Sequence, residues 1–448
     1  MCWLQFLIVH LLLLGLTSYH SCCSVAVVFA FIDDYRHFVW PTLDGTPTKL
    51  AGHRGEKAFL PEHTIASYYQ AGLEGVDFIE PDLALTKDGV PVCHHNEYLS
   101  GTTNIADLPQ FADRRRKYTW VYDGSGPVSV YDWFIVDFTL DELKQVRVRQ
   151  ENFTWRPQVY NDLFAIPTFA EYLDAVRHVS SVLNRSFGIM PEIKSPKLFN
   201  RFMPYPRYFE DTVLAMLQRW GYGVTPDLPP INDAVARYLN TLTTQPAPHA
   251  AVALGPAVIQ SFDADTVQYV SRYLDPTYAA TLRLNEADPT FFTPSGLDLL
   301  ATYTDVVGTW KDMLVAGPEA FYRSRNYTWD QRKVDQMGGF IPPDQFVNEA
   351  HRRGIKVALY TFYSSYQDPN YLCPPAHANG PPPKRAMSVE LGDFCPKDKL
   401  QELFYFFDMG VDYMFVEDIV EAQEARIFYT NKLTSQQQFV VAAADGLR

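Results

Sequence analysis

Cysteine is scarce in this chain and occurs in no metal-binding pattern. Only six cysteines are found among 448 residues, and three of them lie within the first 23. There is no CxxC pair and no Cys/His spacing of the kind that binds zinc, so the sequence does not support a zinc site. Cys373 and Cys395 flank a Pro-rich stretch and could form a disulfide in an oxidising compartment, which would leave Cys93 unpaired and buried in a strand.

Basic side chains are also few. The chain has 38 lysines and arginines against 52 acidic residues, which gives a formal net charge of -14. Nucleic acids and anionic bilayers attract basic surfaces, so this balance repels both. We therefore expect a small-molecule ligand, no nucleic-acid partner, and no stable membrane partner beyond an N-terminal anchor.

No apolar run reaches the roughly 20 residues that a membrane-spanning helix needs. The first 32 residues lack Lys and Arg and hold two shorter apolar pieces, 3–16 and 25–32. This pattern favours a signal peptide over residues 1–30, while the missing basic residue leaves an uncleaved anchor open. Sequons at Asn152, Asn184 and Asn326 are usable only in the secretory pathway, so we expect a secreted or lumenal protein, or alternatively one anchored by its N-terminus.

Short apolar runs that alternate with helical patterns are abundant. Nine runs predict strands, at residues 50–55, 78–85, 90–95, 187–194, 257–262, 278–284, 305–310, 355–362 and 411–418. Such alternation indicates a parallel sheet, and one α/β domain with a closed (β/α)8 TIM barrel explains it better than two domains do. One run is extra, because residues 87–89 (Lys-Asp-Gly) predict a hairpin turn that joins 78–85 to 90–95.

The predicted domain spans residues 48–430 and is followed by a tail, 431–448. Three segments within it are interpreted as insertions, at about 96–138, 222–255 and 366–396. Loops of this length inside a compact domain are usually functional lids or disordered.

Polar side chains gather where the first predicted strands end. Residues two apart on a strand point the same way, so Glu80 and Asp82 share a face. If the chain turns at the two residues Asp88 and Gly89, antiparallel pairing across the hairpin is expected to bring His95 roughly opposite Asp82. His53 and Arg54 end the first strand, at the rim where barrels of this kind build their sites.

A later strand adds a further carboxylate and a lysine, Glu192 and Lys194, which also share a face. Three carboxylates at Glu80, Asp82 and Glu192 suit one hard divalent cation, Ca2+ or Mg2+, rather than zinc. The alternative is a set of salt bridges with Arg54 and Lys194 that needs no metal.

Not every histidine is a candidate. A lone histidine is more often structural or exposed than catalytic, and His63 and His351 are assigned to that class. His53 and His95 differ because each ends an apolar strand, where a polar side chain needs a reason.

An ordered series of motifs resembles the glycerophosphodiester phosphodiesterase family, in particular its longer periplasmic and plant-type members. The motifs are HRG at 53–55, PEHT at 61–64, IEPDLALTKDG at 79–89, VCHH at 92–95, PEIKSP at 191–196, QSFD at 260–263, VGTWKDML at 307–314 and VDYMFVED at 411–418. The similarity covers nearly the whole chain after the leader. Departures are Asn96, where many members have an acid, Tyr363, where many have Arg, and VEDIVE at the last strand.

The resemblance implies metal-dependent hydrolysis of glycerophosphodiesters to sn-glycerol 3-phosphate and an alcohol such as choline, ethanolamine or inositol. It implies that His53 and His95 are the acid–base pair, and that Arg54 and Lys194 bind phosphate oxygens. It also implies a metal held by Glu80, Asp82 and Glu192. The substrate rim is expected to include Gln260, Phe262, Trp310 and Glu417.

Two rival functions stay open. A lysophospholipase D-type activity would need an acyl channel, which the aromatic residues Trp120, Tyr122, Tyr131 and Trp133 could line. A non-catalytic binding protein on the same barrel is the other, because a fold does not prove an activity.

Overall fold

The structure is a computed structural model, which describes residues 39–121, 126–226, 228, 233–242, 252–365 and 399–445. Two units are distinguished. One comprises Trp40–Ile427, and the described residues outside this range belong to the other. The sheet, the large cavity described below and the helices around the sheet lie in Trp40–Ile427, except for the part of the last helix that follows Ile427.

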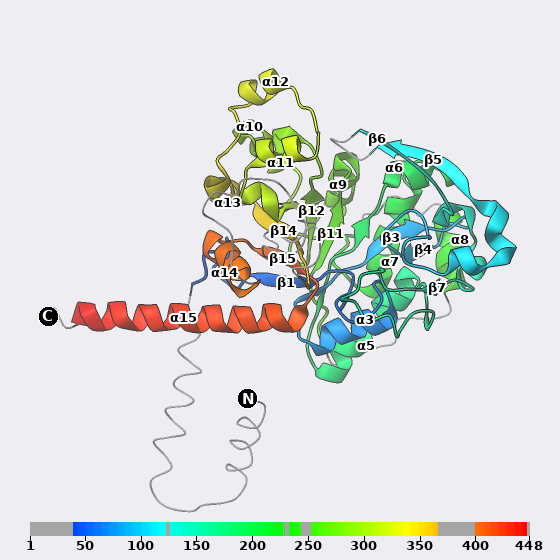
Figure 1. Cartoon of the computed structure of the whole chain (residues 1–448), viewed down its shortest axis with the longest axis horizontal. Helices are drawn as coiled ribbons and strands as arrows, with labels where there is room; N and C mark the ends of the chain where they lie inside the picture. Colours follow the sequence, from blue (N-terminus) through cyan, green and yellow to red (C-terminus); the bar gives the residue numbers. More distant parts are fainter. Residues whose placement is uncertain are drawn as a thin grey trace, which may run out of the picture. The chain divides into compact units, whose positions relative to one another are not determined.

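The core of this unit is a closed parallel barrel with eight strand positions, which confirms the predicted fold class (Figure 1). The positions in order are β1 (Lys49–Gly52), β2 with β3 (Phe78–Ile79, Asp82–Leu85), β9 with β10 (Gly188–Ile189, Glu192–Ile193), β11 (Ala257–Ser261), β12 (Ala279–Leu284), β13 (Val306–Trp310), β14 (Lys356–Phe362) and β15 (Tyr413–Val416). The last strand, β15, pairs with β1 in parallel, with Lys49 opposite Tyr413. This pairing closes the cylinder.

Two neighbouring strand positions are each interrupted by a proline beside a carboxylate. Pro81 separates β2 from β3, and Pro191 separates β9 from β10. Proline has no backbone N–H to donate, but its carbonyl still accepts, and Glu192 N donates to Pro81 O at 2.9 Å. The ladder therefore continues past both breaks and keeps Asp82 level with Glu192.

Each strand position is followed by a helix, as the sequence pattern predicts. These helices are α3 (Ile65–Leu73), α5 (Phe169–Leu183), α7 (Tyr208–Trp220), α9 (Ala264–Ser271), α10 (Pro294–Leu300), α13 (Pro343–His351), α14 (Lys399–Met409) and α15 (Ile419–Asp445). Side-chain caps define several starts. Thr64 and Ser67 form a capping box at α3, and Thr168 and Glu171 form one at α5.

The extra predicted strand is β4 (Pro91–Cys93), which pairs antiparallel with β3. The turn between them has Thr86 N donating to Val90 O, with Gly89 at a φ of 79°. A left-handed third loop residue is typical of a three-residue hairpin loop. Cys93 is buried in this strand as a free thiol, as expected.

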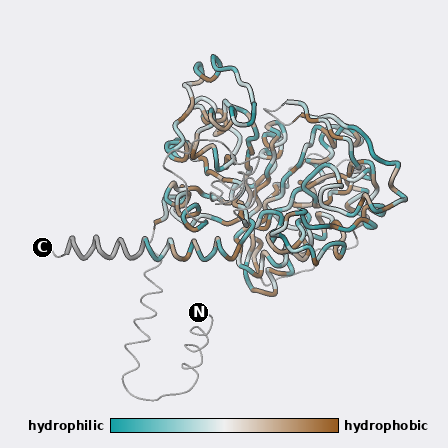
Figure 2. The backbone as a smooth tube through the Cα atoms, viewed as in Figure 1, coloured by the Kyte–Doolittle hydropathy of each residue, from teal (hydrophilic) through white to brown (hydrophobic). Residues whose placement is uncertain are grey.

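The barrel interior is filled by apolar side chains that alternate along the strands with outward-facing residues. The cluster comprises Ala51, Phe78, Met190, Val258, Leu282, Leu284, Val306, Ala358, Tyr360, Tyr413 and Phe415. Figure 2 shows hydrophobic residues concentrated along the inner strands of this unit.

The remaining elements lie outside the barrel sheet. Those of residues 96–165 are three 3-10 turns (Ile105–Asp107, Pro109–Arg114, Ile135–Asp137), the two-stranded sheet of β5 (Arg116–Val121) and β6 (Pro127–Asp132), α4 (Leu140–Leu143), and the pair β7 (Arg147–Val148) and β8 (Phe164–Ala165). Elsewhere lie α6 (Pro196–Phe199), α8 (Asp233–Thr241), α11 (Pro318–Ser324), α12 (Gln331–Gln336) and 3-10 turns at Asn200–Phe202, Pro289–Phe292 and Lys311–Leu314.

Several sequence-based predictions fall outside the described residues. These are the leader at 1–30, the insertion at 366–396 with its two cysteines, and Tyr122. The segment predicted as a tail is largely helical, because α15 continues to Asp445. Among the described residues, no helix combines the length and the apolarity needed to cross a bilayer.

Candidate active site

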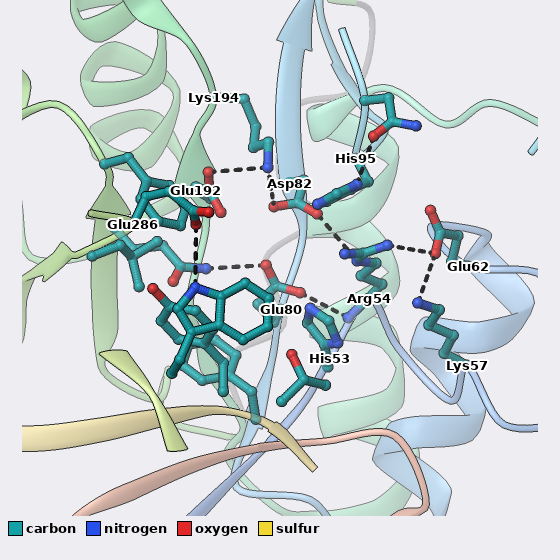
Figure 3. Close-up of a pocket in the computed structure, with 18 of the residues that line it drawn as sticks. His53, Arg54, Lys57, Glu62, Glu80, Asp82, His95, Glu192, Lys194 and Glu286 are labelled. Carbon is teal, nitrogen blue, oxygen red and sulfur yellow. Dashed lines mark hydrogen bonds and ion pairs between the residues drawn. The ribbon is translucent and has the colours of Figure 1, made fainter. Parts of the chain in front are cut away.

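A cavity of about 680 Å3 opens at the carboxyl ends of the barrel strands. Its lining includes all seven residues that the sequence predicts for acid–base chemistry, phosphate binding and metal binding. They are His53, Arg54, Glu80, Asp82, His95, Glu192 and Lys194. These residues come from three adjacent strand positions and the β3–β4 hairpin, so the fold brings together groups far apart in the chain (Figure 3).

Three buried carboxylates meet at the bottom of this cavity. One oxygen from each of Glu80, Asp82 and Glu192 lies within 4.8 Å of the other two. The parallel register explains this, since Glu192 pairs with Asp82 on one side and with Gln260 on the other. Three converging carboxylate oxygens are a ligand set for a hard divalent cation.

The electrostatics of the triad also fit a cation. Burial and the charges of Asp82 and Glu192 raise the pKa of Glu80 well above its ordinary value. Like charges buried this close oppose ionisation, and a bound cation removes that opposition. The triad therefore suits an ion such as Ca2+ or Mg2+, and the donor set does not distinguish the two.

The two predicted catalytic histidines lie at the edge of the triad. His53 follows β1 and is tied to β15 by its backbone N–H, which donates to Val416 O at 2.9 Å. His95 follows β4, and its Nδ1 lies 2.9 Å from Oδ1 of Asn96. Asn96, where many members of the family have an acidic residue, thus contacts the His95 ring through its side-chain oxygen.

Both imidazoles are largely enclosed, which changes their acidity. Burial, with the charge of Arg54, lowers the pKa of His53 to about 4. Burial and the charges of Arg54 and Lys194 lower the pKa of His95 well below its ordinary value. Burial therefore favours the neutral form of both rings, whereas an anion bound beside them would favour the protonated form.

Arg54 is held in an uncommon backbone conformation. Its φ is 62°, its backbone N–H donates to Glu80 at 2.7 Å, and its Nη1 donates to Glu62 at 2.8 Å. A non-glycine residue in this region costs about 1–3 kcal/mol and persists where the surroundings fix it. The guanidinium is thereby aimed along the cavity wall, with Nε 3.5 Å from Asp82.

Lys194 follows β10, the strand that also carries Glu192 of the triad. Its Nζ lies 3.3 Å from Glu192 and 3.9 Å from Asp82. Although burial opposes ionisation of Asp82, the charge of Lys194 and the hydrogen bond with His63 hold its pKa well below the ordinary value. Lys194 and Arg54 thus flank the carboxylates from two sides, where a phosphate group would meet both.

The hairpin register corrects one prediction. Leu83 pairs with Cys93, so Asp82 lies opposite His94 rather than His95, and His94 N donates to Asp82 O at 3.0 Å. The His94 ring is buried, with its Nδ1 at hydrogen-bond distance from Asn96 O, and it does not line the cavity. His95, one residue later, is the ring that enters the cavity.

His63 was assigned a structural or exposed role, and the structure places it against the site. It is buried, with Nε2 2.9 Å from Asp82 and Nδ1 2.7 Å from the Tyr68 hydroxyl. The position of His63 within the PEHT motif, directly before the capping residue of a helix, was the sequence feature that could have indicated a role near the site. It fixes Asp82 rather than lining the cavity.

Glu417 was predicted at the substrate rim, and this is wrong. Its side chain is fully buried behind His53, 3.9 Å from His53 Nδ1. Arg156 contacts its other oxygen at 2.6 Å, and Lys57 lies 3.2 Å away. The apolar end of β15 and two buried cations hold it inward, and those cations keep its pKa well below the ordinary value against the effect of burial.

The other rim predictions agree with the cavity. Gln260, Phe262 and Trp310 all line it, and Gln260 Nε2 donates to Glu80 at 3.0 Å. The sequence analysis missed Glu286 and Tyr327 on the same wall. Neither lies in a motif, and only the curvature of the barrel brings them to the cavity.

The chain is similar to proteins of one family. The family model of the glycerophosphoryl diester phosphodiesterase family matches residues 53–204. A glycerophosphodiester phosphodiesterase of Arabidopsis thaliana is 31% identical over 337 residues, which cover 73% of this chain and 77% of that protein. One from Haemophilus influenzae is 26% identical, covering 62% and 63% of the two chains. A crystal structure from Silicibacter pomeroyi, 16% identical with a TM-score of 0.50, covers 87% of this chain and 98% of that one and shares the fold.

Proposed function

The chain belongs to the glycerophosphoryl diester phosphodiesterase family and hydrolyses glycerophosphodiesters, and we propose that it does so by metal-assisted acid–base catalysis with His53 and His95. The products are sn-glycerol 3-phosphate and an alcohol. The observation that carries this proposal is the convergence of both imidazoles, Arg54 and Lys194 on one buried carboxylate triad.

The two imidazoles divide the proton transfers. One accepts the proton of the glycerol 2-hydroxyl as that oxygen attacks phosphorus, and the other donates a proton to the leaving alcohol oxygen. Water then opens the cyclic phosphate with the two roles exchanged, which restores both rings. Because the nucleophile belongs to glycerol, the leaving alcohol can vary.

Charge on the phosphoryl oxygens is offset by groups already in place. Arg54 and Lys194 bind these oxygens, and Glu80, Asp82 and Glu192 would hold the divalent cation. When bound, the cation supplies Lewis-acid stabilisation of phosphoryl charge. Enclosure of the site strengthens each of these attractions because less water screens them.

The test is a coupled assay for sn-glycerol 3-phosphate with glycerophosphocholine as substrate. We expect the wild-type protein to release it and His95→Ala to lose at least about 100-fold in kcat, the usual contribution of a general acid or base. The thermal unfolding temperature of the variant shows whether its fold is intact. Full activity of folded His95→Ala would refute the assignment.

The structure does not favour the lysophospholipase D alternative. Trp120 and Trp133 are buried inside the insertion, where Trp133 Nε1 donates to Phe111 O. Tyr131 is exposed and stacks with Arg115 instead of facing the cavity. These rings pack the insertion and do not line the active site.

We also propose that the protein enters the secretory pathway. The three sequon asparagines, Asn152, Asn184 and Asn326, are all exposed, as an acceptor site requires. Protein expressed in a eukaryotic secretory host should lose mass on treatment with an N-glycosidase. An unchanged mass would count against this location.

A further inference from the structure

One half of the cavity is aromatic and takes no part in the reaction proposed above. Strands β11, β13 and β14 contribute Phe262, Trp310 and Tyr360, and Tyr327 follows α11. The ring centroids of Trp310 and Tyr360 are 5.2 Å apart, and those of Phe262 and Tyr360 are 6.2 Å apart. These rings form a continuous wall facing the space above the carboxylates.

A single carboxylate, Glu286, is fixed within this wall. One of its oxygens accepts from Trp310 Nε1 at 3.2 Å, and the other accepts from the Tyr327 hydroxyl at 3.0 Å. Both donors are neutral, so they orient the carboxylate without cancelling its charge. In the part of the chain that the structure describes, no lysine or arginine forms an ion pair with Glu286.

The cavity is therefore polarised. The cations Arg54 and Lys57 lie on one side of Glu80, and Glu286 lies on the other (Figure 3). A carboxylate surrounded by aromatic faces attracts an organic cation, because ring quadrupoles and the fixed charge act together. A ligand with an anionic phosphate and a cationic end matches this distribution.

We propose that Glu286 and the rings of Trp310, Tyr360 and Phe262 form a subsite for a cationic amine head group, so that choline- or ethanolamine-type glycerophosphodiesters are preferred over neutral polyol ones. This inference rests on the proposed function, because it specifies the alcohol that leaves.

A hydroxyl-rich head group fits the same wall poorly. The Tyr360 hydroxyl already donates to Asn285 O at 2.6 Å, and Trp310 Nε1 and the Tyr327 hydroxyl already donate to Glu286, so these three groups have no proton left to donate to a head-group hydroxyl. A buried hydroxyl without a partner loses its hydration uncompensated. Two cations oppose this preference in part: the Arg325 guanidinium lies 5.1 Å from the Trp310 ring but does not line the cavity, and Lys194 Nζ lies 5.9 Å from the Phe262 ring within it.

The experiment compares glycerophosphocholine with glycerophosphoinositol in the wild-type protein and in Glu286→Gln. Glutamine keeps the shape and an acceptor oxygen but removes the charge. We expect wild type to favour glycerophosphocholine in kcat/KM, and Glu286→Gln to lower the ratio of the two kcat/KM values about tenfold. The loss should appear in KM for glycerophosphocholine.

Glu319→Gln is the matched control, because Glu319 is an exposed carboxylate on α11 that pairs with Arg323 outside the cavity. It should keep the wild-type ratio. An equal loss on both substrates in Glu286→Gln would overturn the subsite and place Glu286 at the glycerol end. An unchanged ratio would overturn it as well.

A second measurement does not depend on the variant's folding. Tetramethylammonium chloride should inhibit wild-type turnover competitively and more strongly than potassium chloride at the same ionic strength. Equal inhibition by the two salts would overturn the subsite. Failure of the proposed function is distinct, because wild type would then release sn-glycerol 3-phosphate from neither substrate.

Discussion

Glu417 is the residue whose position says most about His53. It is a buried carboxylate behind His53, and its charge is balanced by Arg156 and Lys57. Its Oε1 lies 3.9 Å from His53 Nδ1. At this distance there is no hydrogen bond between the two atoms, but the charge of the carboxylate favours this ring orientation and stabilises the protonated form. In the proposed mechanism Glu417 acts through His53 without reaching the substrate.

We expect Glu417→Gln to lower kcat by roughly ten- to a hundredfold with little change in KM, as loss of an orienting partner does. The charged groups acting on His53 are Glu417, Arg54 and Lys57. Removing the negative one lowers the pKa of His53 further, so its limb of the pH–rate profile moves to lower pH. Steady-state kinetics from pH 3 to 9 measure both effects.

Glu402→Gln is the control for the stability cost. Glu402 is also buried and paired with a buried lysine, Lys311, but it does not line the cavity. Both variants leave a buried cation short of a partner, which is destabilising. Only the Glu417 variant should shift the His53 limb of the pH–rate profile. If both profiles match wild type, Glu417 does not position His53.

Glu56 is a second buried carboxyl group whose ionisation affects stability, and it is unrelated to catalysis. Burial and the neighbouring Glu74 raise the pKa of Glu56 to about 10. A carboxyl whose folded pKa is raised gives its full stability below its unfolded pKa and loses it as pH rises toward the folded pKa. Folding of the wild-type chain should therefore weaken between about pH 5 and pH 9.

Glu56→Gln removes this titration. We expect the variant to gain stability over wild type as pH rises, by at most roughly 1.4 kcal/mol per pH unit. Unfolding temperatures of both proteins across pH 5 to 9 give the comparison. Parallel curves would show that Glu56 is ionised in the folded protein.

Among the elements, the β3–β4 hairpin does most to place the site, because Asp82 begins one strand and His95 follows the other. Its turn depends on Gly89, whose φ is 79°. A Cβ added there would also overlap the Tyr208 side chain of α7. We expect Gly89→Ala to destabilise the fold by roughly 1–3 kcal/mol, measured by denaturant unfolding.

Gly354 separates the two causes of this cost. Its φ is 73°, but an added Cβ would meet nothing within 4 Å. Gly354→Ala should therefore lose stability through backbone strain alone, and the loss should be smaller than in Gly89→Ala. An equal loss in both would mean that contact with Tyr208 contributes nothing.

The strands were predictable because each is a short buried run, and buried positions are occupied mostly by apolar residues, which the sequence shows directly. The register of the hairpin was not, since three loop residues rather than two shift the pairing by one position and exchange His95 for His94 opposite Asp82. The partners of Glu417 were also hidden. Arg156 lies 261 residues away in the chain, and no local pattern links the two.

For the molecule as a whole, the carboxylate triad would couple binding of the proposed cation to stability. Three buried acids repel one another without a cation, and a ligand at 100 times its Kd adds about 2.7 kcal/mol to folding. We expect exhaustive chelation to abolish turnover and lower the unfolding temperature, and added Ca2+ or Mg2+ to restore both. Calorimetry and the coupled assay measure the two effects.

Glu192→Gln is the matched variant, since it removes one ligand and keeps the side-chain shape. Its unfolding temperature should respond much less to either cation. Chelated wild-type protein that retains full turnover would remove the metal from the mechanism.

The order of the barrel strands has a consequence for how the protein is made. Strand β1, which leads into His53, is held on one side by β15, more than 360 residues later in the chain. A ribosome must release nearly the whole sequence before His53 gains its neighbours Val416 and Glu417. Contacts this distant in sequence form late in folding. Under the proposed mechanism, we therefore expect nascent chains to gain activity toward phosphodiesters only once β15 has paired with β1.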